Sequence, residues 1–476
     1  MNADDFLKLL ANGKNDADFE GFLKFTSDKL WNQYNDYLMD NILITENKVN
    51  AIVVNLPNAS ENKPYEHTVD FGDPRIVIVR AEGLVAETHG LAITVSDDKK
   101  SFKIAGTPDL NPIRNSGIDV ESTFELTVFY TYEGLSLPPQ KTLLERKLSL
   151  VINQDPRYLW KNIPVDWDNM PEPKYYKEDT GYAYVTVKAL PDGTPQKDIV
   201  AASKRGRSHA QEGKPRDDHF ELYHNDQTNW YVIAVADGAG SAKFSREGSR
   251  IACGVAVEVC KKALSNCEKF EENINLWHID QKSEDAGKLV STDIYNILGK
   301  AAHTAHNEIK AEAARTKNRL KDYATTLLLA ICKKFDFGWF VASFWVGDGA
   351  MCLYDKEKHT SVLLGAPDEG EYGGQTRFLT MPEIFANPTD FFSRLKCRIV
   401  PDFTALFLMS DGVSDPKFET DVNLNSTEKW DALWDDLKDN GVELTDDNEA
   451  AKEQLLNWLD FWSVGNHDDR TIAILY

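Results

Sequence analysis

The sequence predicts a multidomain protein in which a helical segment and an all-β module precede an α+β domain whose helices cover its sheets. Three observations support this fold class. The chain has 476 residues, which is too many for one ordinary domain. Its apolar residues recur at helical spacing up to about residue 46 and then at a spacing of two. Beyond residue 199, apolar strands outnumber the helices between them, which argues against a simple doubly wound sheet.

Residues 1–46 form the predicted helical segment. Leu30, Trp31, Tyr34, Leu38 and Ile42 recur at intervals that place them on one face of a helix. Such a face needs a surface to cover it, either elsewhere in the chain or on a protein partner.

Residues 47–154 are predicted to form a β-sandwich. Short apolar runs, from Ala51–Val54 through Leu91–Val95 to Phe124–Tyr132, are separated by turn-forming clusters. The stretch 90–108 resembles a segment of bacterial immunoglobulin-like modules, in which one strand leads by a turn into a second strand ending in Gly-Thr-Pro. No catalytic constellation is visible in this module. A binding or positioning role and a purely structural spacer both stay open.

Residues 155–198 are predicted to be a proline-rich linker, and residues 199–476 the α+β domain. The six prolines of the linker oppose helices and central strands, although the run Tyr182–Val187 could supply a first strand of the next domain. The α+β domain offers strands such as Trp230–Ala236 and Ala405–Met409, and helices such as Ser245–Cys267 and Ser291–Arg315.

The composition restricts the classes of partner. A formal charge of -23 disfavours both nucleic-acid phosphates and anionic membrane surfaces. No signal peptide opens the sequence, no apolar run is long enough to span a bilayer, and none of the six cysteines forms a CxxC pair. These features predict a cytoplasmic protein without a zinc site. The acidity mainly serves solubility, or else part of it holds cations.

Three Asp-Gly pairs each follow a strongly apolar strand, at Asp237, Asp348 and Asp411. A single such pair is usually a hairpin turn. Strands of a sheet converge in space, however, and clustered carboxylates stay ionised only if cations lie among them. Oxygen ligands with few histidines or cysteines favour Mg²⁺ or Mn²⁺. The pattern therefore indicates a metal centre at the strand ends.

The same motifs, taken in order, resemble those of the type 2C metal-dependent serine/threonine protein phosphatases. They are GRSH at 206–209 with RDD at 216–218, DGAGS at 237–241, TT at 325–326, VGDG at 346–349, SDGVSD at 410–415 and DDRT at 468–471. The DGAGS loop is most similar to a bacterial branch. The resemblance implies a central antiparallel β-sandwich flanked by helices, with a two-metal site at one end.

The resemblance also implies a role for each matched residue. Asp237 would bridge two Mn²⁺ or Mg²⁺ ions, and Gly238 would offer its carbonyl group as a ligand. Asp411 and Asp468 would bind the first metal.

Two further positions have less definite roles. Asp217 or Asp218 would support the second metal, and Asp348 would belong to a third, weaker site. The implied activity is hydrolysis of phosphoserine or phosphothreonine in a phosphorylated protein substrate, by a water molecule activated between two metal ions.

The sequence departs from the family pattern in two places. Where well-known members carry a histidine, this chain has Ala239, so that His209, His219 or a water would have to protonate the leaving group. The usual phosphate-binding arginine is missing as well, and Arg216, Arg207 or Lys214 could replace it. The stretch 365–374, rich in glycine and acidic residues, is expected to form a flap beside the cleft.

Two functions follow from these observations. The first is a bacterial phosphoprotein phosphatase whose N-terminal modules contact a protein partner. The second is a catalytically weak or inactive scaffold that keeps the fold and binds phosphoproteins. The departures at Ala239 and at the arginine favour the scaffold, whereas the complete set of aspartates favours the enzyme.

Overall fold

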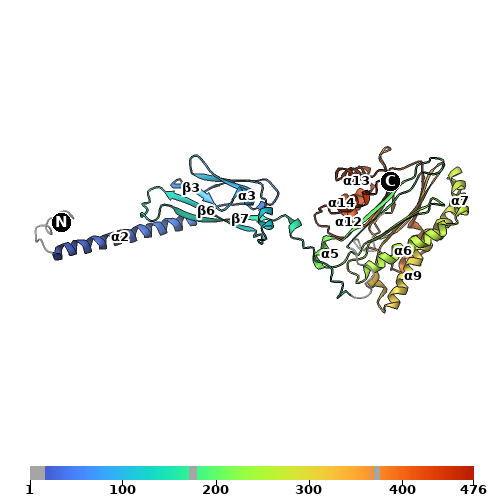
Figure 1. Ribbon diagram of the computed structural model, residues 1–476, viewed down its shortest axis with the longest axis horizontal. Coiled ribbons are helices and arrows are strands. Elements are labelled where there is room, and N and C mark those ends of the chain that lie inside the picture. Colours follow the sequence, from blue (N-terminus) through green and yellow to red (C-terminus); the bar gives the residue numbers. More distant parts are fainter. Residues whose placement is uncertain (1–16, 171–178, 366, 369–375) are drawn as a thin grey trace. The chain divides into compact units, whose positions relative to one another are not determined.

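The computed structural model describes residues 17–170, 179–365, 367–368 and 376–476. The first sixteen residues of the predicted helical segment and most of the predicted flap lie outside these ranges. The chain divides into two compact units, Met1–Leu159 and Trp160–Tyr476. Each unit is described by itself (Figure 1).

The long helix α2 (Ala17–Asn50) is covered along only part of its length. Leu38, Ile42 and Val49 are buried in the core of the first unit. Further towards the N-terminus, the side chains of Leu30 and Trp31 are 61% and 57% exposed. The predicted apolar face therefore meets its own unit at one end and solvent at the other.

Two β-sheets form the rest of the first unit and enclose a single apolar core. One sheet has the strand order β1-β7-β6-β3 and the other the order β2-β5-β4. The segment Ala51–Val54 forms no strand, contrary to the prediction, because α2 continues to Asn50 and a turn follows. The elements are β1 (Ala59–Ser60), β2 (Tyr65–Asp70), β3 (Ile76–Glu82), α3 (Ala86–His89), β4 (Leu91–Val95), β5 (Ser101–Gly106), α4 (Asn111–Asn115), β6 (Thr123–Tyr132), β7 (Leu144–Asn153) and η1 (Pro156–Tyr158).

The second unit is built on two antiparallel sheets, with strand orders β10-β11-β12-β13-β16 and β15-β14-β17-β18-β9-β8. Strand β8 lies inside the predicted linker 155–198 and pairs with β9, so this part of the segment belongs to the sheet. The strands are β8 (Thr180–Val185), β9 (Ile199–Lys204), β10 (His219–His224), β11 (Tyr231–Ala236), β12 (Leu327–Phe335), β13 (Gly338–Val346), β14 (Ala350–Asp355), β15 (Thr360–Gly365), β16 (Leu395–Val400), β17 (Ala405–Met409) and β18 (Arg470–Leu475).

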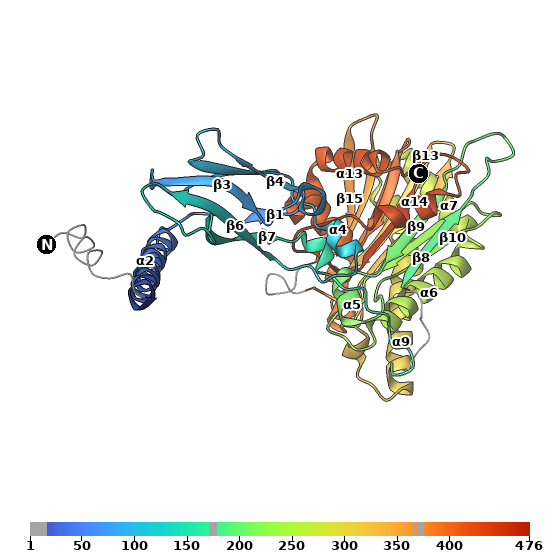
Figure 2. The same ribbon diagram turned by 60° about the vertical axis from the view of Figure 1, so that its left-hand side comes forward.

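Helices cover both outer faces of this β-sandwich, with α6 and α9 on one side and α13 and α14 on the other (Figures 1 and 2). The predicted helix 291–315 is realised as α8, a π-helical segment and α9 in direct succession. The helical elements are α5 (Arg207–Glu212), α6 (Ser245–Leu264), α7 (Glu268–Ile279), α8 (Glu284–Ile294), η2 (Tyr295–Gly299), α9 (Lys300–Arg315), η3 (Leu320–Tyr323), α10 (Glu383–Ala386), α11 (Pro388–Ser393), α12 (Asp411–Phe418), η4 (Asp421–Asn425), α13 (Thr427–Asp439) and α14 (Ala451–Trp458).

The pairing of the strands brings the turns that carry the aspartates to one edge of the sandwich. Ala236, at the end of β11, pairs with His219, the first residue of β10. In the other sheet, Met409 at the end of β17 pairs with Ile472 near the start of β18. Turns after β11 and β17 and before β10 and β18 therefore lie together, and these turns carry the aspartates.

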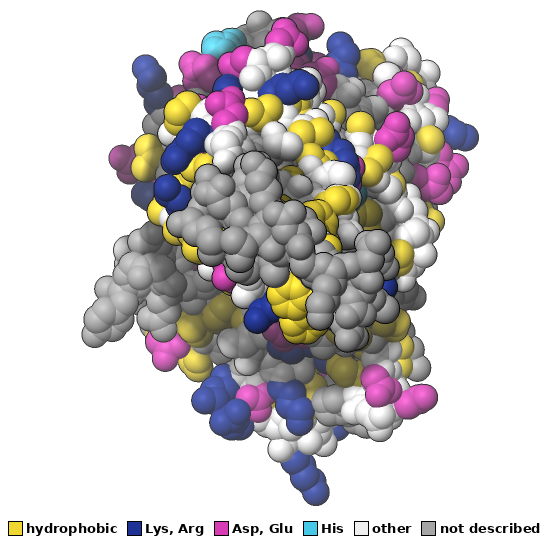
Figure 3. Space-filling model, turned by 90° about the vertical axis from the view of Figure 1, so that its left-hand side faces the viewer, with side chains coloured by type: hydrophobic (Ala, Val, Ile, Leu, Met, Phe, Trp, Pro, Cys, Tyr) yellow, Lys and Arg dark blue, Asp and Glu magenta, His cyan; other side chains and the backbone are white. Residues whose placement is uncertain are grey.

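The surface combines both signs of charge. Acidic and basic side chains alternate with apolar ones over the face that Figure 3 presents. Within the described part of the chain, no helix is both long and apolar enough to cross a membrane.

Candidate metal centre

Asp237, Asp348 and Asp411 converge, as the three Asp-Gly pairs predicted. One carboxylate oxygen from each lies within 4.8 Å of the other two. Asp237 follows β11, Asp348 follows β13, and Asp411 is the first residue of α12. The cluster therefore joins both sheets at the shared end of the sandwich.

The cluster is half-buried, with single carboxylate oxygens fully covered, and its carboxylates repel one another. Burial raises the pKa of Asp237 well above its usual range, and the charges of Asp218 and Asp411 raise it further. Burial likewise raises the pKa of Asp411 well above its usual range, and the charges of Asp348 and Asp468 raise it further. A cation among these oxygens would relieve the repulsion and return the carboxylates to their ionised form.

Unsatisfied oxygens within the cluster show that the residues fit a metal ion. Oδ1 of Asp218, Asp348 and Asp411 is buried and has no hydrogen-bond partner among the described residues. Buried acceptors without a partner are costly, and native proteins seldom leave them so. Carboxylate oxygens are the ligands that Mg²⁺ and Mn²⁺ prefer. The donor set is therefore suited to hard divalent cations.

Backbone contacts hold the Asp237-Gly238 turn in place. The amide of Asp237 donates to Oγ1 of Thr326 at 2.8 Å, and the amide of Thr326 donates to the carbonyl of Asp237 at 2.8 Å. A Cβ atom added at Gly238 would lie 2.6 Å from the carbonyl oxygen of Asp217 and 2.9 Å from Cβ of Ser245. Glycine is thus required here for close packing of the turn against the segment that carries Asp217.

The structure separates the two candidates Asp217 and Asp218. Asp218 lies with the cluster: it accepts a hydrogen bond from Oγ of Ser410 at 2.8 Å, and its charge raises the pKa of Asp237. Asp217 instead has a carboxylate oxygen 3.7 Å from Nε2 of His209. Burial and neighbouring Asp469 raise the pKa of both residues to about 7. The geometry favours Asp218 as the ligand of the cluster.

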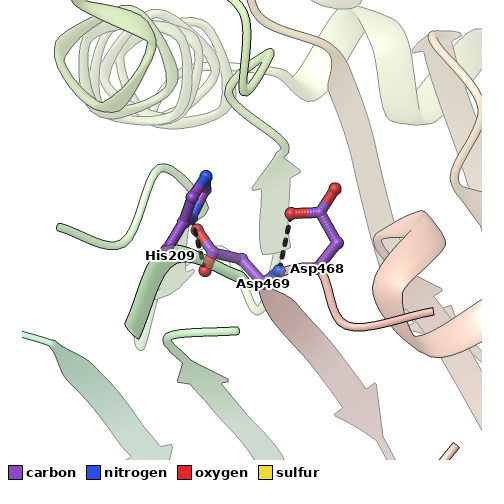
Figure 4. Close-up of side chains that lie close together, drawn as sticks. All are labelled: His209, Asp468 and Asp469. Carbon is purple, nitrogen blue, oxygen red and sulfur yellow. Dashed lines mark hydrogen bonds and ion pairs between the residues drawn. The ribbon is translucent and has the colours of Figure 1, made fainter. Parts of the chain in front are cut away.

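Asp468 and Asp469 precede β18 and lie beside His209 of α5 (Figure 4). One ligand atom from each of the three residues lies within 4.8 Å of the others. Nδ1 of His209 is 3.0 Å from Oδ1 of Asp469 and donates its proton to it. Burial lowers the pKa of His209, but the charges of Asp469 and Asp217 and this hydrogen bond outweigh it and raise the pKa to about 10. His209 is therefore a partner of Asp469.

Asp469 was not among the residues singled out from the sequence. Its Oδ1 accepts the backbone N–H of Gly206 at 2.6 Å, and its Oδ2 accepts that of Asp217 at 2.5 Å. The carboxylate therefore ties the segment 206–218 to the start of β18, where Asp468 lies. The sequence signal that points to Asp469 is its position as a second acidic residue directly after Asp468, the expected ligand.

Both arginine candidates donate hydrogen bonds to backbone carbonyl groups. Arg216 is 1% exposed, and its Nη1 donates to the carbonyl of Ser203 at 3.0 Å. Its guanidinium lies beneath Gly181, where an added Cβ would be 2.9 Å away. Arg207 donates to the carbonyl groups of Asp460 and Phe461. The expected catalytic role of Arg216 conflicts with this burial.

The remaining candidates also differ in position. Lys214 pairs with Glu212 on the surface. His219 begins β10, and burial together with the charges of Arg216 and Arg250 lowers its pKa to about 3. Ala239 contributes a backbone N–H that donates to the carbonyl of Ala324 at 3.0 Å. His209 is thus the histidine that the structure brings to the aspartates.

Comparison with known proteins gives a family match within the second unit. The family model described as Protein phosphatase 2C matches residues 205–460, more than half of the chain. A search of curated proteins finds no match.

Among solved structures, a C. elegans sex determining protein is 14% identical with a TM-score of 0.37, over 59% of this chain and 65% of that protein. The catalytic domain of the serine/threonine protein phosphatase PstP, in complex with two manganese ions, is 17% identical with a TM-score of 0.33, over 62% of this chain and 98% of that domain. RsbX in complex with magnesium is 14% identical with a TM-score of 0.30, over 62% and 100%.

The match to the family model covers the segment that carries most of the converging motifs, from the start of α5 to the turn after α14. The aspartates of the cluster, Asp218, Asp237, Asp348 and Asp411, all lie within it. The chain belongs to the protein phosphatase 2C family.

Proposed function

We propose that this protein hydrolyses phosphoserine and phosphothreonine in proteins, with two Mn²⁺ or Mg²⁺ ions as cofactors. The observation that carries the proposal is the aspartate cluster, in which Asp218, Asp348 and Asp411 each keep a buried oxygen without a hydrogen-bond partner among the described residues. Divalent cations bound there would supply Lewis acidity towards phosphoryl oxygens and a lower pKa for water.

The chain's own residues have separate tasks in this proposal. Asp237 would contribute oxygens to both cations, Asp411 and Asp468 would hold the first, and Asp218 would support the second. Asp348 would serve a third, weaker site. The carbonyl group of Gly238 would be a further ligand, and close packing holds the turn that carries it in place.

His209 is the proposed proton donor to the leaving alkoxide. Asp469 accepts from Nδ1, so that Nε2 faces the loop at Gly240, where an added Cβ would lie 3.6 Å from Nε2. In this position, Nε2 borders both the aspartates and the loop that replaces the family histidine by Ala239.

The experiment is hydrolysis of an aryl phosphate by the purified protein. We expect turnover with added Mn²⁺, loss of turnover with EDTA, and loss in Asp237→Asn and Asp411→Asn. Turnover by the wild type in EDTA would contradict the mechanism.

The second candidate function is a phosphoprotein-binding scaffold without turnover. It is favoured by Ala239, which stands where well-known members of the family carry a histidine. It is also favoured by the burial of Arg216, which was a candidate to replace the missing phosphate-binding arginine. Calorimetry distinguishes the two, because a scaffold binds a phosphopeptide and leaves it intact over hours in saturating Mn²⁺.

For the first unit, we propose an immunoglobulin-like module on residues 47–154 that, with the helix, contacts a protein partner. The exposed side chains of Leu30 and Trp31 support such a contact. The division into 1–46, 47–154, 155–198 and 199–476, the relation to the bacterial DGAGS branch, and a cytoplasmic location are parts of the same proposal.

A further inference from the structure

A pocket of about 530 Å³ opens beside the metal centre. Three segments line it: residues 241–242, residues 319–324 and residues 378–382. Its volume lies in the range of about 300–1,000 Å³ that is usual for ligand-binding sites. None of the aspartates of the cluster lines it, so it is a separate feature.

Each wall of the pocket runs directly from the aspartate cluster. Ser241 lies four residues after Asp237 in the same loop. Ala324 lies two residues before Thr326, whose amide donates to the carbonyl of Asp237 at 2.8 Å. On the third side, Phe378 lies two residues after Thr376, whose hydroxyl donates to the carboxylate of Asp348.

These short connections limit the separation between the pocket and the cluster. An extended chain spans about 3.3–3.6 Å per residue. The walls begin two to four residues from the cluster, so they lie no farther from it than two to four extended residues can span. An extended ligand of the same length can therefore reach from the cluster to the pocket. A phosphorylated residue held at the aspartates would bring its near neighbours in sequence to the pocket.

The walls themselves are fixed by hydrogen bonds and ring contacts. The amide of Phe244 donates to the carbonyl of Asp322 at 2.7 Å, and the rings of Phe244 and Tyr323 stack at 5.1 Å. The amide of Leu379 donates to the carbonyl of Thr325 at 2.8 Å. The pocket is therefore a formed feature of the fold, which lowers the cost of ordering a ligand.

The pocket is apolar inside and basic at its edge. Leu320, Phe378 and Met381 contribute apolar surface. At the edge, Arg319 is neutralised by Asp322, with Nη2 2.7 Å from Oδ1.

Two lysines lie at or next to this edge. Lys321 lines the pocket, Lys243 follows its wall residue Ala242, and both are exposed. Within the described part of the chain neither lysine forms an ion pair, and Nζ of Lys243 lies 5.0 Å from the centre of the Phe244 ring. In a chain of net charge -23, this edge is suited to a ligand of the opposite sign.

We propose that this pocket, through Lys243 and Lys321 at its edge, selects phosphoprotein substrates that carry an apolar residue next to acidic residues, two to four positions from the phosphorylated residue. The inference rests on the proposed phosphatase function and names the substrate class of that site. The apolar side chain enters the pocket, and the acidic side chains face the two lysines.

The test compares two phosphoserine peptides with the Mn²⁺-loaded protein. Both have leucine at positions two and three from the phosphoserine on each side, flanked by glutamates in one peptide and by lysines in the other. An aryl phosphate, which is too short to reach the pocket, serves as the reference substrate. We expect kcat/KM for the acidic peptide to exceed that for the basic peptide by about fivefold or more.

Charge reversal isolates the two lysines. In Lys243→Glu/Lys321→Glu, we expect the preference for the acidic peptide, each rate taken relative to the aryl phosphate, to disappear or reverse. Lys282→Glu, which changes an exposed lysine between α7 and α8, should keep it. When serines replace the leucines of the acidic peptide, its kcat/KM relative to that of the aryl phosphate should fall.

Two results would overturn the inference: equal kcat/KM for both peptides with the wild type, or a double variant that behaves as Lys282→Glu does. Failure of the proposed function is distinguishable, because then no phosphate ester is hydrolysed. In that case the same peptides, labelled with fluorescein, report on the pocket through anisotropy. Equal affinity for the acidic and basic peptides would again overturn it.

Discussion

The carboxylate of Asp469 lies 3.0 Å from Nδ1 of His209, and the same carboxylate accepts the backbone N–H groups of Gly206 and Asp217. One buried side chain thus orients a histidine and ties two segments that carry metal-ligand candidates. Hydrogen bonds to a buried carboxylate are among the stronger ones in proteins.

Asp469→Asn should destabilise the protein, because an amide cannot accept at both atoms and removes the negative charge that faces Nδ1 of His209. We expect the free energy of unfolding to fall by about 2–3 kcal/mol. Urea unfolding in EDTA measures it. Asp460→Asn is the control, since this carboxylate is 62% exposed where it pairs with Arg207, and should cost less than about 1 kcal/mol. Equal losses would refute the special position of Asp469.

Two glycines in one loop offer a matched comparison. Gly238→Ala would place Cβ 2.6 Å from the carbonyl oxygen of Asp217, whereas Gly240→Ala would place it 3.6 Å from Nε2 of His209, an ordinary contact. We expect Gly238→Ala to weaken Mn²⁺ binding by about tenfold or more, as displacement of supporting groups does in other metal sites. Gly240→Ala should stay within about threefold. Isothermal titration calorimetry measures both affinities, and similar losses in the two variants would argue against the packing role of Gly238.

The pH dependence of stability should differ between the metal-free and the metal-loaded protein. In the folded protein, the pKa values of Asp217 and Asp218 are raised to about 7, from about 3.9 in an unfolded chain. Between these values the folded state binds more protons than the unfolded state, so stability falls as the pH rises from about 4 to about 7.

In EDTA, we therefore expect a lower melting temperature at pH 7.5 than at pH 5.5. In excess Mn²⁺, which requires the ionised carboxylates, the gain in melting temperature should be larger at pH 7.5. Asp218→Asn should flatten both trends. A metal-free protein that becomes more stable across this range would contradict the assignment of a repulsive buried cluster.

Helix α2 provides a test of the first unit with two isoleucines. Ile42 is 1% exposed and Ile44 is 64% exposed. We expect Ile42→Ala to lower the free energy of unfolding of this unit by about 2–4 kcal/mol, because it removes buried methyl groups and leaves a cavity. Ile44→Ala should change it by less than about 0.5 kcal/mol. Chemical denaturation followed by circular dichroism measures both, and equal effects would show that α2 does not dock as described.

The residues themselves explain which features the sequence could predict. Apolar strands that end in Asp237, Asp348 and Asp411 could be read directly from the sequence. Strands β11 and β13 end at the same edge of their sheet because both pair antiparallel with β12, which lies between them. Side chains alternate between the two faces of a strand, and this period of two also applies to β11 and β17. The metal-centre prediction therefore needed no knowledge of the tertiary structure.

Other features depend on tertiary contacts that local patterns do not contain. Arg216 resembles a surface cation in the sequence, but the pairing of β8 with β9 places Gly181 over its guanidinium. Ala51–Val54 has the composition of a strand, yet helix α2 continues to its edge. The choice of Asp218 over Asp217 depends on which side of one turn faces Ser410. None of these could be settled by spacing alone.

The most direct test of the central claim is a Mn²⁺ titration of the metal-free protein, followed by electron paramagnetic resonance, for the wild type and for Asp237→Asn. The account predicts two tightly bound Mn²⁺ ions whose signal shows spin coupling in the wild type, and loss of the coupling in Asp237→Asn. A wild type that binds no Mn²⁺, or an Asp237→Asn variant with the same number of coupled ions, would contradict the claim that the converging aspartates form a two-metal centre.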